Sequence, residues 1–337
     1  TIVRELLKFA ESGQLYRGAK PVMWSPVEKT ALAEAEVEYE DIVSTQIDVA
    51  FEIVEAPNAP DLVGAYAVIW TTTPWTIPVN QAIAYGPDVE YVLAQAGSRK
   101  VIIAAELSAA FAARAGVDVA PLRSLKGNDL AGAIARHPMH TKGDFFARPR
   151  PLLAGDFVTT DSGTGLVHMA PDHGEDDFDL CKANGLDPVF AVEGDGRYKA
   201  DWAWLGGEGS VINPKFNAPD GPICAALAEA GALVAASADY KHSYPHSWRS
   251  KAKVIFRCTP QWFVPMRDDL GADGLRGKAL KAISETRFVP EKGRNRIGSM
   301  VEGRPDWVLS RQRAWGVPIT LFVDRKTGQY LNDPAVN

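Results

Sequence analysis

The sequence predicts a mixed α/β fold whose central part is a β-barrel-like domain decorated by short helices. Between about residues 44 and 240, short β-branched and aromatic runs alternate with Gly, Pro, Asn and Asp. Such runs are typical of strands joined by turns, and only a few segments there have helical periodicity. Beyond Tyr240 the composition changes to basic residues, tryptophans and prolines, which indicates a domain boundary.

The individual elements follow from local patterns. Residues 1–13 place apolar side chains on one helical face, and residues 16–25 are rich in strand formers. Residues 34–41 alternate acidic and apolar side chains, as in a strand with one solvated face, and 46–54 continue as a strand. Further strands are predicted at 65–72, 91–93, 101–104, 165–169 and 233–235, and helices at 106–114, 176–183 and 223–230. We therefore expect a central domain of residues 44–240 between segments 1–43 and 241–337.

Charge is distributed unevenly along the chain. The 337 residues carry a formal net charge of −6. Residues 1–240 hold 18 Lys and Arg against 33 Asp and Glu, whereas residues 241–337 hold 18 against 9. The asymmetry indicates a polyanionic partner for the C-terminal third, although a solvated basic surface would give the same count.

Composition also argues against several classes of protein. No apolar run approaches the roughly 18 residues needed to span a bilayer, and residues 1–13 do not resemble a secretory signal. Three cysteines without a CxxC pair argue against a disulfide framework or a zinc knot. Neither G-x-G-x-x-G nor a phosphate-binding loop occurs. We expect a protein of the reducing cytoplasm, with no membrane contact.

The first notable motif is AVIWTTTPWTIPVN, residues 67–80. Because Pro74 and Pro78 lack an N–H and fix φ, the chain should leave the sheet there as a rigid loop. The hydroxyls of Thr71, Thr72 and Thr73 would then be held on a fixed backbone, where they can orient a water or a sugar hydroxyl. The same sequence is also compatible with a threonine-rich strand that is followed by ordinary turn prolines and has no binding role.

The second motif is SGTGLVHMAPDHGEDDFDLCKANG, residues 162–185. A short strand ends near His168, and Glu175, Asp176 and Asp177 open a helix. Acidic residues in a first turn are favoured by the helix dipole, which explains part of this cluster. A partly buried Asp177 would in addition be a receptor for an ammonium group. A metal site built from His168, His173, Asp176 and Asp177 is a further alternative, although no fixed metal-ligand spacing occurs.

The third motif interleaves basic and aromatic residues over 240–263 and again over 304–318. Lysine and arginine among tryptophans suit contacts to phosphates and stacking on bases. Tryptophans of this kind also serve as ordinary core residues, so the pattern alone leaves both interpretations open.

Together these segments resemble the isoleucyl-tRNA synthetases, which are class I aminoacyl-tRNA synthetases. WTTTPWTIP, GTGLVHMAPDHGEDDF, HSYPHSWRSKAKVIFRCTPQWF and RPDWVLSRQRAWGVP stand in the order in which that family carries them. His-x-Gly-His and Lys-Met-Ser-Lys-like signatures, which bind ATP in class I enzymes, do not occur here. The resemblance therefore implies an internal fragment that holds the editing domain and stubs of the Rossmann catalytic core, with ATP and zinc bound elsewhere in the full-length enzyme.

The resemblance also implies an activity. The editing domain hydrolyses valine from mischarged tRNA(Ile), whereas the full-length enzyme ligates isoleucine to tRNA(Ile) with ATP. We expect metal-free attack of water on the aminoacyl ester, no cofactor in this fragment, and a monomer. A non-catalytic tRNA-binding module over residues 241–313 and a metal-dependent hydrolase using His168, His173 and Asp176 are the alternatives.

Site residues follow from the same resemblance. The catalytic group consists of Thr72 and Thr73, which position the terminal ribose and a water, and Asp177, which holds the α-ammonium. The amino-acid pocket of the editing site is expected to contain Thr71, Trp75, Asn80, His168 and Asp176. Gln312 and Trp315 match a segment at the border of the synthetic site.

Overall fold

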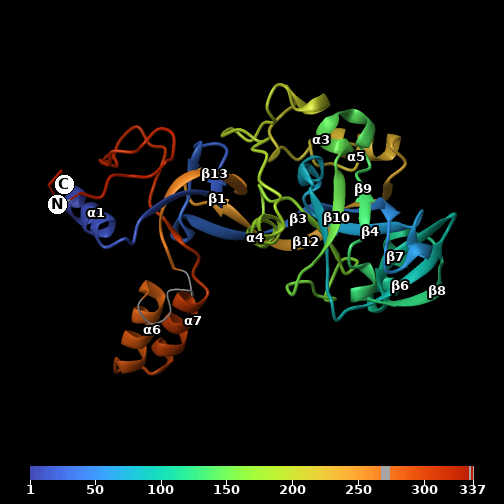
Figure 1. Ribbon diagram of the computed structural model, residues 1–337, viewed down its shortest axis with the longest axis horizontal. Helices are drawn as coiled ribbons and strands as arrows, with labels where there is room; N and C mark the ends of the chain where they lie inside the picture. Colours follow the sequence, from blue (N-terminus) through green and yellow to red (C-terminus); the bar gives the residue numbers. More distant parts are fainter. Residues whose placement is uncertain (267–273, 334, 337) are drawn as a thin grey trace.

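The computed structural model describes residues 1–266, 274–333 and 335–336, and the strands in these ranges form two sheets. Figure 1 shows an elongated molecule, with both chain termini at one end and the larger sheet at the other. Helices and strands are interspersed along the chain, so the mixed α/β class is confirmed.

The smaller sheet joins the two ends of the chain. It has four strands in the order β14-β13-β1-β2. Their bounds are β1 Tyr16–Ser25, β2 Thr30–Ala31, β13 Ile255–Val264 and β14 Trp307–Val308. β1 and β13 pair in antiparallel fashion from Tyr16 opposite Phe263 to Trp24 opposite Ile255. The two flanking segments of the sequence are thus hydrogen-bonded to each other.

The larger sheet has ten strands, in the order β11-β5-β10-β9-β3-β4-β7-β6-β8, with β12 paired to β3. Its strands are β3 Val37–Glu55, β4 Tyr66–Thr71, β5 Ala82–Tyr85, β6 Glu90–Ala96, β7 Arg99–Ala104, β8 Val119–Lys126, β9 Ile134–Arg136, β10 Pro149–Ala154, β11 Leu166–Met169 and β12 Leu233–Ser247. Within the described ranges this order is an open path from β11 to β8, so the expectation of a barrel is corrected. The spacing of short strands in a sequence indicates how many strands there are, but not which edges pair.

The longest ladder is the antiparallel ribbon formed by β3 and β12, which have 19 and 15 residues. It runs from Val37 opposite Ser247 to Val49 opposite Leu233. The sequence predicted two separate strands in place of β3 and only residues 233–235 of β12. β3 is longer because the β-branched Ile42, Val43 and Thr45 continue the strand, and β12 is longer because pairing with β3 extends it through a polar stretch.

The helices mostly lie where periodicity predicts them. Their bounds are α1 Ile2–Glu11, α2 Ser108–Ala115, α3 Asp144–Ala147, α4 Glu175–Ala183, α5 Pro222–Glu229, α6 Leu275–Glu285 and α7 Lys292–Glu302. α1, α2, α4 and α5 match the predicted segments within about two residues, the usual uncertainty of helix ends. α6 and α7 were not predicted; they form a hairpin that extends away from both sheets (Figure 1).

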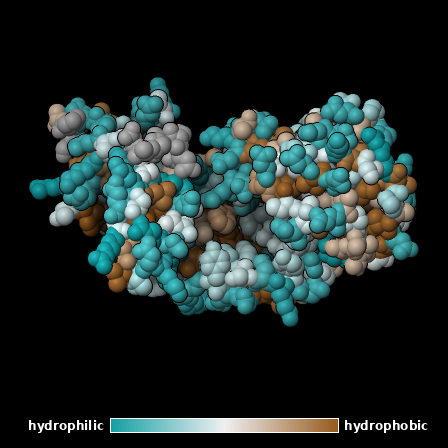
Figure 2. All heavy atoms as spheres, turned by 90° about the horizontal axis from the view of Figure 1, so that it is seen from below, coloured by the Kyte–Doolittle hydropathy of each residue, from teal (hydrophilic) through white to brown (hydrophobic). Residues whose placement is uncertain are grey.

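One cluster of buried apolar side chains connects the two sheets. It includes Trp24 and Phe263 from the smaller sheet together with Phe51 and Ile69 from the larger one. Figure 2 shows a hollow near the middle of the molecule, where apolar atoms lie exposed among hydrophilic side chains. The two sheets therefore share a core rather than being joined only by covalent linkers.

A buried ion pair attaches α2 to the ribbon. The guanidinium of Arg114 donates to both carboxylate oxygens of Asp48, at 2.9 and 2.8 Å, and to the carbonyl of Gly163 at 3.0 Å. Asp48 is only 1% exposed, and its burial raises its pKa even though Arg114 opposes that shift. The carboxylate therefore depends on its one cationic partner.

We predict that Arg114→Met lowers the free energy of unfolding by about 3–5 kcal/mol, because it leaves a buried charge unpaired. Urea unfolding followed by circular dichroism measures the loss. The double variant with Asp48→Leu should recover most of it, since the charge that needs a partner is then absent. Equal stability of the single variant and the parent would contradict the prediction.

Candidate functional site

The threonine motif leaves the sheet as the sequence predicts. β4 ends at Thr71, and the 3-10 helix η3, Pro74–Val79, begins with Pro74. The N–H of Thr73 donates to the hydroxyl of Thr71 at 3.1 Å, which closes the turn between them. All six residues of η3 are buried, so the turn is fixed by packing as well as by proline.

A chain of hydrogen bonds connects this turn to β11. Thr71 and Thr73 hydroxyls are 3.1 Å apart, and the hydroxyl of Thr76 donates to the carbonyl of Thr73 at 2.9 Å. His168 Nε2 lies 2.8 Å from Thr76 Oγ1, and its Nδ1 lies 3.2 Å from Asn80 Nδ2. Two motifs that are 92 positions apart in the sequence are therefore in direct contact.

The network assigns the protonation state of His168. Asn80 Nδ2 also donates to the carbonyl of Ala82 at 2.8 Å, which identifies it as the amide nitrogen. Nδ1 of His168 therefore accepts, and Nε2 carries the proton that it donates to Thr76. Burial, and then the nearby His173, lower the pKa of His168 to about 3, so the ring is neutral and fixed in one orientation.

Asp177 lies in the first turn of α4, where its carboxylate accepts the N–H of Ala170 at 2.7 Å. Burial raises the pKa of Asp177 to about 7, against the effect of that N–H. Among the described residues no lysine or arginine forms an ion pair with it. Asp176 is exposed, and its negative charge contributes to the raised pKa of Asp177. Asp177 is thus a half-buried carboxyl group with no cationic partner in the described part of the chain.

A small cavity of about 80 Å³ adjoins the threonine turn. Thr72, Thr73 and Trp75 form one wall. The remaining lining residues are Val43, Ser44, Thr45, Val211, Ile212, Pro214, Asn217, Tyr244, Lys253 and Ile255. His168, Asn80 and Asp177 do not line it. The structure thus connects the threonines to His168 and Asn80 by hydrogen bonds, but it does not place Asp177 in the cavity of the threonines.

Sequence reasoning missed two residues of this site. Thr76 is the direct contact of His168, and its position three residues after Thr73 in a 3-10 turn was the only available signal. Tyr198, whose hydroxyl donates to the carbonyl of Trp75, lies in a segment without any recognisable motif. The Trp75 ring in turn contacts His173, with centroids 4.6 Å apart.

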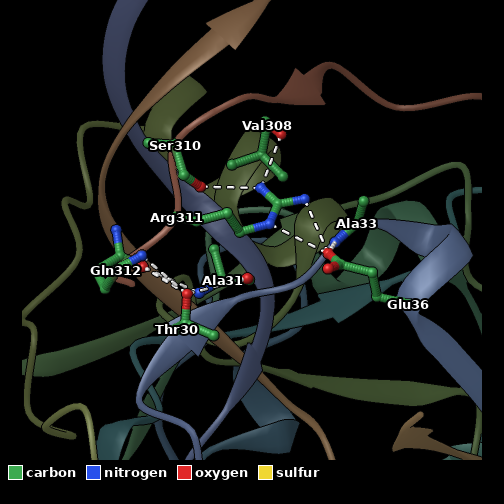
Figure 3. A network of polar contacts seen from close by, with 8 residues as sticks. All are labelled: Thr30, Ala31, Ala33, Glu36, Val308, Ser310, Arg311 and Gln312. Atoms are coloured by element: carbon green, nitrogen blue, oxygen red, sulfur yellow. Dashed lines mark hydrogen bonds and ion pairs between the residues drawn. The ribbon is translucent and has the colours of Figure 1, made fainter. Parts of the chain in front are cut away.

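Gln312 lies apart from the threonine turn, beside the smaller sheet. Figure 3 shows Gln312 against Thr30 and Ala31, and its side-chain oxygen accepts the N–H of Ala31 at 3.0 Å. The neighbouring Arg311 donates to Glu36 at 3.0 and 3.1 Å (Figure 3). Trp315 is 92% exposed. Gln312 therefore attaches the C-terminal segment to β2, and the ring of Trp315 is free to contact a ligand.

A larger cavity of about 420 Å³ lies between α4 and the smaller sheet. Its lining combines apolar residues such as Val22 and Phe263 with charged ones, among them Lys20, Glu175 and Asp306. Lys20 and Asp306 already form an ion pair at 2.7 Å. The charges of this cavity are therefore largely compensated within the protein.

The metal alternative finds no support in the donor geometry. Over the described ranges no group of three or more His, Cys, Asp or Glu side chains is arranged to hold an ion. Both ring nitrogens of His168 are engaged, and His173 Nδ1 donates to the carbonyl of Phe256 at 2.7 Å. His168, His173 and Asp176 do not converge. The three cysteines are buried and unpaired.

Comparison with known proteins places the chain in a family. The family of class I tRNA synthetases (I, L, M and V) matches residues 1–336. The chain belongs to the class I tRNA synthetases. It is 61% identical to the isoleucine–tRNA ligase of Zymomonas mobilis and 50% identical to that of Gluconobacter oxydans, over 100% and 99% of its own length. It spans 36% of the length of each of these relatives.

Solved structures give a weaker likeness to this synthetase chain. The crystal structure of GlLeuRS-CP1 matches 42% of the chain and 62% of its own, with 18% identity and a TM-score of 0.36. A leucyl-tRNA synthetase editing domain from P. falciparum matches 42% of the chain and 68% of its own, with 12% identity and a TM-score of 0.33. These superpositions are too partial to support an argument about the site. No helix in the described part of the synthetase chain is long and apolar enough to cross a membrane.

We predict that Thr76→Val lowers the free energy of unfolding by about 1–3 kcal/mol, because it leaves the buried Nε2–H of His168 without an acceptor. Thr72→Val is the matched control. Within the described residues the Thr72 hydroxyl has no partner, so its loss should cost less than about 0.5 kcal/mol. Urea unfolding of both variants makes the comparison, and equal losses would contradict the assigned hydrogen bond.

Proposed function

We propose that the chain proofreads tRNA(Ile) by hydrolysing the ester that joins a misplaced valine to the terminal ribose. The observation that carries this proposal is the hydrogen-bonded link from the threonine turn through Thr76 to His168 and Asn80. It fixes hydroxyl groups and a neutral imidazole beside each other on rigid elements. Such an arrangement suits positioning of an ester and a water more than covalent catalysis.

Proofreading is needed because one methylene distinguishes isoleucine from valine only weakly. A missing methylene is worth about 1–3 kcal/mol in an apolar pocket, and isoleucyl-tRNA synthetase is a known example of this limit. A second site must therefore admit valine and reject isoleucine by size. We assign the wall of that site to His168, whose two hydrogen bonds prevent the ring from moving aside.

The roles of the polar groups follow from their chemistry. Asp177 binds the α-ammonium of the substrate, since its carboxyl group has no cation of its own among the described residues. Thr72 and Thr73 orient the ribose and the attacking water, with Thr71, Trp75 and Asn80 supporting them. Water adds to the ester carbon, the ribose oxygen leaves with a proton, and hydrogen bonds stabilise the charge that develops on the carbonyl oxygen.

For the whole protein we propose ligation of isoleucine to tRNA(Ile) with ATP, in the cytoplasm and as a monomer. The 61% identity to an isoleucine–tRNA ligase supports ligation and the tRNA partner. Zinc is also implied by the resemblance, but no suitable ligand set occurs in the described ranges. Gln312 and Trp315 are proposed to border the synthetic site.

A non-catalytic tRNA-binding module is the second candidate, and the 18 basic residues of segment 241–337 favour it. Incubating the protein that carries this chain with Val-tRNA(Ile) and with Ile-tRNA(Ile), with and without a chelator, separates the alternatives. Proofreading predicts loss of valine only, unaffected by chelator. Binding without hydrolysis, or hydrolysis that stops with chelator, would overturn it.

We predict that Asp177→Asn lowers kcat/KM for deacylation of Val-tRNA(Ile) by about 10- to 100-fold, because a hydrogen bond to a charged group is worth about 1.5–3 kcal/mol. Asp179→Asn is the matched control, since it removes an exposed charge from the same helix. Parent-like activity of Asp177→Asn would contradict the ammonium-binding role.

The pH dependence gives a separate prediction. The pKa of Asp177 is raised to about 7, so below pH 7 the free carboxyl group is protonated and does not attract an ammonium group. We expect kcat/KM for deacylation to fall about tenfold per pH unit below that value. Asp177→Asn should lack this limb of the profile. Rates measured between pH 5 and 8, with spontaneous hydrolysis subtracted, provide the test.

A further inference from the structure

A network of polar side chains in the smaller sheet has no role in the proposal above. It connects β2 and β13 to residues 310–312, the segment that leads from β14 towards Trp315, and Figure 3 shows part of it. Thr30, Gln261 and Ser310 of this network are buried, and Gln261 is only 2% exposed. Burying polar side chains costs free energy unless they are hydrogen-bonded, so their contacts hold the segment in one place.

Two backbone N–H groups fix the direction of the side-chain hydrogen bonds. The N–H of Ala31 donates to the side chain of Gln312 at 3.0 Å, which identifies the accepting atom as the amide oxygen. The N–H of Trp262 donates to the hydroxyl of Ser310 at 2.9 Å. The amide nitrogen of Gln312 and the hydroxyl proton of Ser310 therefore remain as donors, and both donate to Oε1 of Gln261, which lies 3.1 Å from Nε2 of Gln312. Gln261 is thus the acceptor that two residues of the segment share.

Thr30 holds the backbone of the same segment. Its hydroxyl accepts the N–H of Gln312 at 2.9 Å and lies 3.3 Å from the side-chain oxygen of Gln312, to which it can donate its own proton. The main chain of Gln312 is therefore held from β2, and its side chain is held from both β2 and β13. Beside this network, the ion pair of Arg311 with Glu36 attaches the segment a second time.

Gln312 is the last residue before Trp315 that the protein holds by hydrogen bonds. In the described part of the chain, Arg313, Ala314 and Trp315 form no hydrogen bond, and Trp315 is 92% exposed. The position of the Trp315 ring therefore depends on how firmly Gln312 is held, three residues before it.

We propose that Gln261 and Thr30 are positioning residues for the isoleucine-binding site: both are buried, and both act on Trp315 through Gln312. This inference rests on the proposed function in one respect, the assignment of Trp315 to the border of the synthetic site. The face of an exposed tryptophan ring is apolar, which suits the hydrocarbon side chain of isoleucine. A segment that is already held presents this face at no further cost, whereas a loosely held segment must be ordered when the substrate binds.

The test measures aminoacylation of tRNA(Ile) by the whole protein that carries this chain, with isoleucine and ATP varied separately. Gln261→Met should raise KM for isoleucine about 3- to 10-fold, the effect of one lost hydrogen bond, and leave kcat and KM for ATP unchanged. Looser positioning weakens binding of the ground state and of the transition state equally, and such a change appears in KM alone. A merely structural role would instead leave fewer folded molecules, which lowers the apparent kcat at unchanged KM.

Two further variants control for the substitution. Gln261→Glu keeps an acceptor oxygen for Ser310 and Gln312, so its KM for isoleucine should stay within about twofold of the parent value. Gln81→Met is the matched control, because Gln81 is also buried and donates from Nε2 to the carbonyl of Asp187 at 2.8 Å, but it lies beside the larger sheet. This control should leave KM for isoleucine unchanged.

Thr30→Val keeps the test decisive if Gln261→Met does not fold. The substitution conserves shape and removes only the hydroxyl that accepts the N–H of Gln312, so it should also raise KM for isoleucine at unchanged kcat. Equal KM for isoleucine in Gln261→Met and Gln81→Met, or a fall in kcat alone, would overturn the positioning role.

Trp315→Ala tests the border assignment by itself. A parent-like KM for isoleucine in Trp315→Ala would reject that part of the proposed function and, with it, the path through Trp315. A raised KM in Trp315→Ala together with a parent-like KM in Gln261→Met would reject only the positioning role. The two failures are therefore distinguishable.

Discussion

The antiparallel pairing of β3 with β12 is the constraint on which the rest of the molecule depends. The two strands enter the larger sheet from the side of the smaller one, and Ser44 lies opposite Tyr240 in the middle of the ladder. Asp48, which binds α2 through Arg114, and Ser44 and Thr45, which line the small cavity, all belong to β3. A shift of one residue in this register would exchange the buried and exposed faces, so the ion pair and the cavity would be lost together.

The hydrogen bonds around His168 have a comparable role at shorter range. Burying an imidazole costs less free energy when both of its nitrogens are hydrogen-bonded, and Thr76 and Asn80 supply one acceptor and one donor to His168. Because the ring is neutral, it adds no charge next to Asp177, whose pKa shift arises from burial and from Asp176. The fold thus holds a neutral, fixed imidazole on β11 and a titratable carboxyl group on the helix that follows it.

The sequence was sufficient for elements with a strong local pattern. Residues 16–25 were predicted as a strand with the observed bounds of β1, and the acidic start of α4 was recognised from its first turn. What could not be predicted depends on pairing between distant segments. The polar residues 236–247 form a strand only because β3 supplies partners, and the open order of the larger sheet follows from edges that no local pattern reveals. For the same reason the residue types of the site were found, but Thr76 and Tyr198 were not. Asp177 was expected beside the threonines, and the structure places it outside their cavity.

That separation of Asp177 from the threonine cavity has a chemical rationale. An aminoacyl ester carries a positive ammonium group on its amino-acid side and neutral hydroxyl groups on its ribose side. Asp177, with no cationic partner in the described part of the chain, lies on the α4 side of the hydrogen-bonded chain. The threonine turn lies at the other end of that chain, connected to β11 through Thr76. A carboxylate on one side of a row of neutral hydroxyls would orient such a substrate by its ammonium group, with the ester at the hydroxyls. A carboxylate inside the small cavity would instead pair with Lys253, which lines it, and this mutual neutralisation would compete with binding of the ammonium group.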